Sequence, residues 1–246
     1  MAEPVIREDK KVEINGSEEI WRLQWQTPPE LECSRKNDDW YTGPCMGFSY
    51  GESGQLDLVR IKNGHETERL HLTQFFDEDA VISLPPSKTS EPKIAILRKW
   101  PVLKGDFDKT ELEDEDIHRR RQLDVISIAD YNNDSVSRGF FLPTISVAEH
   151  EYGVVIGVTR DNPNLHAFNS LANPKLPLYL QDTQWAAVRL KKPKAINWTC
   201  GDHGSEDETE EIFHYPKAGG IEVAERTYSC EDGFSYRGKL LSETSK

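Results

Sequence analysis

The sequence is short of basic residues. Its 246 residues include 30 Lys and Arg against 43 Asp and Glu, so the formal net charge is −13. A nucleic-acid backbone is bound by Lys and Arg that displace its counterions, and the acid excess argues against such a partner. The same charge would be repelled by an anionic membrane surface. We expect a protein or a carbohydrate as the ligand, and no nucleic acid.

Long apolar runs are also missing. The longest runs, such as 152–158, are far too short to span a bilayer, so we expect no membrane insertion. No apolar leader follows Met1, which means that the protein is cytoplasmic or that a leader was removed and Met1 was added for expression. Hydrophobic residues make up only 36% of the chain, but six Trp, eight Tyr and nine Phe are too many for a disordered chain. The composition is that of a folded, soluble protein.

Cysteine is scarce, and the few that occur allow two interpretations. The chain contains Cys33, Cys45, Cys200 and Cys230. Pairing neighbours along the chain would give the bridges Cys33–Cys45 and Cys200–Cys230, which is the simplest of the possible connectivities. Two bridges suit an exported domain, whereas four thiols suit a cytosolic one. We favour an extracytoplasmic location, with a cytoplasmic one as the alternative.

Familiar catalytic motifs are absent from the sequence. It has no G-x-G-x-x-G after a strand pattern, no Walker A motif and no H-E-x-x-H. The segment 47–51, GFSYG, matches G-x-S-x-G with Ser49 as the nucleophile, but a turn and a strand pattern follow where that motif needs a helix. We expect an aromatic β-turn there. Cys200 and His203 could begin a zinc site, yet no second pair of ligands completes it.

Short apolar or aromatic runs separated by turn residues recur along the whole chain. In the run 19–26, Trp21, Leu23 and Trp25 alternate with polar or smaller residues, the period-2 pattern of a half-buried strand. Repeated strands with turn signals between them predict an all-β fold of antiparallel sandwich or propeller-like sheets, with one or two short helices. The expected strands cover 19–26, 55–61, 66–72, 93–99, 122–129, 137–142, 152–159, 194–199, 208–215, 219–225 and 236–241.

Two segments have helical patterns. The first runs from a cap at Asp182 or Thr183 to Leu190, with Trp185 and Val188 on one face. The second, 108–121, places acids four residues before bases, although it could also be a solvated linker. This charged stretch is the best candidate for a boundary. It predicts a β-rich unit over 1–105, a linker or helix over 106–121 and a β-rich unit over 122–246, with a single domain as the alternative.

One segment carries a pattern of metal ligands. An apolar run over 123–129 leads into Asp130, Asn132 and Asp134, whose oxygens could converge on a hard cation, with the carbonyl of Val136 as a further ligand. This segment, 123–142, resembles the FG-GAP/VCBS repeat, in which an apolar strand leads into a D-x-[DN]-x-D-G loop.

The resemblance implies β-propeller blades, calcium bound in the loop, and extracellular adhesion or scaffolding roles. It covers about 20 of the 246 residues, and Ser135 replaces the usual Gly while Arg138 stands where an acid is expected. The alternative is an Asn/Asp-rich hairpin turn that needs no ion.

These observations favour a non-catalytic, β-rich binding or structural module, with calcium as its one expected cofactor. A hydrolase on a β scaffold is the first alternative, since any of the 43 acids could meet in space. A small acidic cytosolic interaction or inhibitor protein is the second, because it fits the charge of −13 equally well. We predict no catalytic residue.

Overall fold

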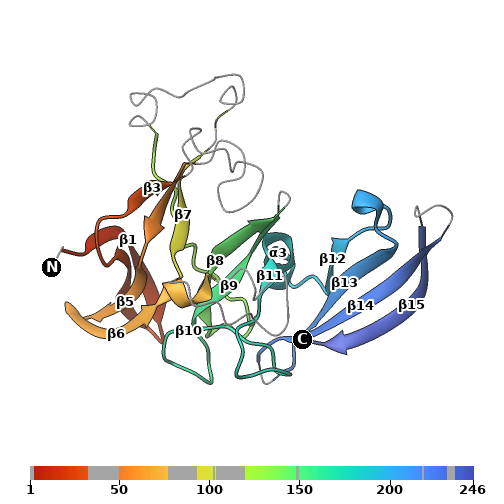
Figure 1. The fold of residues 1–246 in the computed structure, drawn as a ribbon. Coiled ribbons are helices and arrows are strands. Elements are labelled where there is room, and N and C mark those ends of the chain that lie inside the picture. The colour runs from red at the N-terminus through yellow and green to blue at the C-terminus, as the bar shows by residue number, and fades with distance from the viewer. Residues whose placement is uncertain are drawn as a thin grey trace. The chain divides into compact units, whose positions relative to one another are not determined.

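The computed structural model confirms the all-β class. It describes residues 3–32, 50–76, 93–101, 103, 120–147, 150–217, 219–231 and 236–246. These residues form four antiparallel sheets and one α-helix (Figure 1). The predictions for Ser49, for Cys33 and Cys45, and for most of the charged segment 106–121 fall outside the described residues.

The chain divides into two compact units. The first consists of Met1–Ser127 with Phe141–Gly153, and the second of Ile128–Phe140 with Val154–Lys246. The division predicted at residues 105 and 122 stays a prediction.

The main sheet of the first unit follows from its alternating strands and its turns. Its order is β1 (Val5–Ile14), β2 (Ser17–Trp25), β5 (Leu56–Lys62) and β6 (His65–His71). Asn15–Gly16 and Asn63–Gly64 join β1 to β2 and β5 to β6, and all four residues have positive φ. Such two-residue Asn-Gly turns match the twist of a hairpin. The strands expected over 19–26, 55–61 and 66–72 are confirmed, whereas β1 was not predicted.

A second, smaller sheet completes the first unit. It has the order β3 (Glu30–Glu32), β4 (Tyr50–Gly54) and β7 (Ala95–Trp100), and a short 3-10 helix, η1 (Leu72–Phe75), follows β6. The strand expected over 93–99 is confirmed as β7. Arg7 of β1 forms a buried ion pair with Glu52 of β4, and this pair ties the two sheets together.

The strand expected over 122–129 is wrong. The segment makes one isolated bridge, Ala129 to Gly139, and no ladder. Its N–H groups find other acceptors, because Val125 donates to the carboxylate of Glu8 at 2.6 Å and Leu123 donates to the carbonyl of Lys99 at 2.9 Å. The carboxylate of Glu8 in β1 thus accepts hydrogen bonds that the sequence pattern predicts would go to a neighbouring strand.

The next elements along the chain are a small sheet and the helix. In the sheet, β9 (His150–Val158) lies between β10 (His166–Ala167) and β11 (Leu180–Gln181), and β8 (Arg138–Val147) also pairs with β9. Of β8 and β9, the residues within Phe141–Gly153 belong to the first unit and the others to the second. The strands expected over 137–142 and 152–159 are confirmed. Helix α3 (Asp182–Arg189) is confirmed as well, with Trp185 and Val188 buried.

The predicted cap of α3 is wrong by a residue or two. The N-cap is Gln181, whose N–H donates to the side chain of Gln184 at 2.6 Å within a capping box. A glutamine can close this box because its amide oxygen accepts a hydrogen bond from a backbone N–H.

The rest of the second unit is a four-stranded sheet in chain order. It consists of β12 (Lys194–Trp198), β13 (Asp207–His214), β14 (Glu222–Glu231) and β15 (Tyr236–Ser245), with a short helix η3 (Asp202–Gly204) between β12 and β13 (Figure 1). The strands expected over 194–199, 208–215 and 236–241 are confirmed. The one expected over 219–225 starts later, at Glu222, because Gly219 and Gly220 have positive φ. In the part of the chain that the structure describes, no helix is long and apolar enough to cross a membrane.

Candidate functional site

The predicted calcium loop is a tight turn that packs on α3. Asn133 and Ser135 both have positive φ, so Ser135 adopts the conformation that a glycine would favour at this position. The Asn133 side chain donates to the carbonyl of Val188 at 3.0 Å, and Tyr131 meets Trp185 edge to face with ring centroids 5.6 Å apart. These contacts with α3 hold the loop in place.

Both carboxylates of the loop accept hydrogen bonds from the loop itself. Asp130 accepts from the N–H groups of Asp134 at 3.3 Å and Ser135 at 2.6 Å. Asp134 accepts from the N–H groups of Val136 at 2.8 Å and Ser137 at 2.7 Å, and from the Ser137 hydroxyl at 2.8 Å. The loop therefore satisfies its acids with its own donors.

Two arginines cover the carbonyl groups of the loop. Arg160 donates to the carbonyl of Asp134 at 2.7 Å, and Arg138 donates to the carbonyl of Ser137 at 2.8 Å. Burial alone would raise the pKa of Asp134, but hydrogen bonds from Ser137 and Val136, together with the charge of Arg160, hold that pKa below its usual value.

This arrangement matches the ion-free alternative for Asp130, Asn132, Asp134 and Val136. The loop's own N–H groups bond to the carboxylate oxygens that calcium would need, and Asn132 turns its amide nitrogen toward the hydroxyl of Ser137 at 3.3 Å. No group of three or more His, Cys, Asp or Glu side chains that could hold a metal occurs among the described residues. Calcium in this loop stays a prediction.

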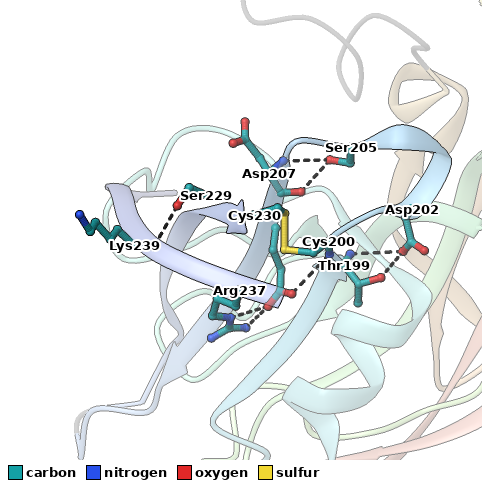
Figure 2. Close-up of a disulfide and its surroundings, with 10 residues drawn as sticks. Thr199, Cys200, Asp202, Ser205, Asp207, Ser229, Cys230, Arg237 and Lys239 are labelled. Carbon is teal, nitrogen blue, oxygen red and sulfur yellow. Dashed lines mark hydrogen bonds and ion pairs between the residues drawn. A yellow bond between two sulfur atoms is a disulfide. The ribbon is translucent and has the colours of Figure 1, made fainter. Parts of the chain in front are cut away.

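The second candidate region surrounds a disulfide. Figure 2 shows Cys200, which follows β12, joined to Cys230 of β14, with an S–S distance of 2.20 Å and Cα atoms 5.6 Å apart. This bridge confirms one of the two predicted pairs. It also excludes Cys200 as a zinc ligand, because the sulfur is not a thiolate.

Two acids of β13 beside this bridge are buried. A run of acids such as 206–211 is usually solvated, but Glu208 and Glu210 each form an ion pair with Arg237 of β15. The guanidinium of Arg237 stacks 4.3 Å from the ring centre of Tyr228, and the Tyr228 hydroxyl donates to Glu210 at 2.9 Å. Burial would raise the pKa of Glu210, but the hydrogen bonds of Arg237 and Tyr228 lower it.

A third cluster was missed because its members are scattered in sequence. The side chain of Asp57, on β5, is 1% exposed and lies 2.6 Å from Nδ1 of His71 and 2.8 Å from Arg69. Gln26 donates to the same carboxylate at 3.0 Å. Burial would raise the pKa of Asp57, but the hydrogen bonds of Gln26, His71 and Arg69 lower it. An acid within the apolar run 56–61 was the one available signal.

Comparisons with known proteins suggest no function for these three clusters. No family model matches the sequence, and no curated protein and no solved structure gives a significant match to the chain.

Proposed function

We propose that the chain is a non-catalytic, β-rich binding or structural module with a protein or carbohydrate ligand. One observation carries the proposal: in the part of the chain that the structure describes, the most deeply buried carboxylates are all paired with cations. The side chains of six of them are only 1–3% exposed, and each has a cationic partner within the same unit; they belong to Glu19, Glu52, Asp57, Asp134, Glu210 and Glu211.

A catalytic acid or base must reach the proton that it transfers. A candidate needs to lie within hydrogen-bond distance of the substrate, directly or through one water. A carboxylate enclosed by its own ion-pair partners has neither the access nor the free acceptor for that task. We infer that these paired, buried acids instead help to fix the register of the strands that contribute them.

The disulfide supports an exported module. Disulfides persist in oxidising compartments and are rare in the cytosol. The bridge Cys200–Cys230 therefore favours an extracytoplasmic location over that of a cytosolic interaction or inhibitor protein.

Activity assays on the wild type test the non-catalytic role, and a matched pair of variants tests the structural role of the buried acids. Asp57→Asn removes a buried carboxylate, and Asp124→Asn removes one in the same unit whose side chain is 58% exposed. We expect no turnover of chromogenic esters, phosphates or glycosides by the wild type, and a melting temperature lowered by roughly 4–10 °C in Asp57→Asn alone.

One geometric feature keeps a hydrolase as the second candidate. His71 is 65% exposed, and its Nδ1 is held by buried Asp57, as a carboxylate orients the imidazole of a general base. Turnover of any of these substrates that is lost in His71→Gln, while the melting temperature is unchanged, would replace the proposed module with an enzyme.

A further inference from the structure

The last strand, β15, is an open edge. It is the outer strand of the sheet β12–β13–β14–β15 (Figure 1). It runs for ten residues, and all but Gly238 are exposed. An edge strand presents a row of backbone N–H and C=O groups that another strand can pair with.

The exposed edge also carries apolar side chains. Tyr236 is 66% exposed, Leu240 51% and Leu241 58%. Residues 224–230 of the neighbouring strand β14 are only half-buried, so neither face of this hairpin is well covered. An edge strand with apolar side chains in water gains stability when a further strand pairs with it and covers them.

The register of β15 is symmetric about Leu240. Leu240 pairs with Tyr228, Glu243 with Arg226 and Arg237 with Cys230, so β15 has one extra residue on each side of Leu240. Because alternate residues of β14 share a face, their partners Arg237, Leu240 and Glu243 also share one face of the sheet. A cation and an anion thus stand at equal distances from a central leucine.

We propose that β15 pairs antiparallel with β15 of a second copy of this chain, about a two-fold axis at Leu240. In that register each Arg237 lies opposite Glu243 of the other copy, and the two Leu240 side chains meet at the axis. Opposite charges directly across an antiparallel pair are stabilising, whereas a parallel arrangement would place like charges together. The two-fold contact closes after two copies.

The bulges of β15 do not prevent this pairing. Bulges often protect an edge by twisting it away from flat partners. Here one extra residue lies within three residues on each side of Leu240, so the two-fold axis places each bulge of one copy opposite the other bulge of the second copy. The register is therefore selective for this strand, and an ordinary flat strand would fit it less well.

The other edge of the sheet is a poorer partner. Strand β12 has only five residues, and helix α3 packs beside it. Pairing β15 of one copy with β12 of the next would also be head to tail, which leads to open assemblies.

Sedimentation equilibrium in 0.15 M salt tests the proposal, because that salt screens the net charge of −13 beyond about 8 Å. We expect the wild type to change from the 28.1 kDa chain mass to twice that mass with concentration. Leu240→Lys places two like charges at the axis and should raise the dimer dissociation constant at least tenfold. Leu190→Lys is the matched control, since Leu190 is 58% exposed in the same unit and should leave the constant unchanged.

Cross-linking tests the register of the proposed strand pairing. In Leu240→Cys the two thiols would face each other across the axis at a Cα distance that permits a disulfide, so mild oxidation should yield a covalent dimer. Leu190→Cys should remain a monomer on denaturing, non-reducing gels. A wild type that stays monomeric at high concentration, or a dimer that Leu240→Lys leaves intact, would overturn the proposal.

Discussion

Nζ of Lys246 lies 2.9 Å from a carboxylate oxygen of Glu211, a residue buried on β13. Gln184 of α3 donates to the same carboxylate, so this one acid joins the helix to the last residue of the sequence. Burial raises the pKa of Glu211, and the charge of Lys246 only partly opposes it.

Removing the cation should therefore cost stability. Lys246→Met leaves Glu211 buried without its charge partner. We expect a loss of roughly 1–3 kcal/mol, below the value for a fully buried pair because the Lys246 side chain is 34% exposed. Urea unfolding measures the change, with Lys217→Met, at an exposed position of the same unit, as the control. Adding Glu211→Gln should restore part of the loss, and no restoration would contradict the pairing.

The lowered pKa of Asp57 predicts how the stability of the folded protein falls at low pH. Its pKa in the folded protein is held below the ordinary value of 3.8, so the unfolded chain binds the proton more readily. The carboxylate thus contributes stability above pH 3.8, and the contribution is lost as pH falls through the lower folded value. The gap in melting temperature between wild type and Asp57→Asn should be widest above pH 4 and should close toward pH 2. A constant gap across that range would show that Asp57 acts by packing alone.

Local patterns predicted much of the fold. The alternation around Trp21 predicts β2 because this signal depends only on neighbouring residues of one strand. The helix around Trp185 was predictable for the same reason. The segment 122–129 was not, because its donors are satisfied by Glu8, a side chain more than 110 residues away.

The candidate sites also differ in how far the sequence could predict them. The Asp130 loop was found because its oxygens follow one another in the chain, and even its ion-free closure is a local property of the turn. Arg237 reaches Glu208 across β14, with a placement that depends on the bulges of β15. A single sequence does not specify such a register, so the burial of these acids could not be predicted from it.

The Asp134 loop makes a prediction that separates calcium binding from a self-contained turn. Asp134→Ala would leave the N–H groups of Val136 and Ser137 without their acceptor, which should cost about 1–3 kcal/mol in either case. Titration calorimetry of chelator-treated wild type distinguishes the two. Because the loop satisfies its own acids, we expect no heat with millimolar calcium and no shift in melting temperature.

Calcium binding would instead give a saturable heat with a dissociation constant on the order of 10⁻⁴–10⁻³ M, as in extracellular modules. That heat should vanish in Asp134→Ala and persist in Asp161→Ala, which removes an exposed acid from the same unit. This outcome would restore the FG-GAP interpretation of the loop.

The disulfide Cys200–Cys230 should make a measurable contribution to stability. The bridge joins residues 30 apart, and constraining an unfolded loop of that length stabilises the folded state by roughly 3.6 kcal/mol in the chain-entropy model. The double variant Cys200→Ser, Cys230→Ser should therefore melt about 7–14 °C below the wild type in differential scanning calorimetry. Alkylation without reductant should leave Cys200 and Cys230 unmodified in the natural protein. If both cysteines react, or if the double variant melts with the wild type, the bridge is not part of the native fold, and the argument for an oxidising compartment fails with it.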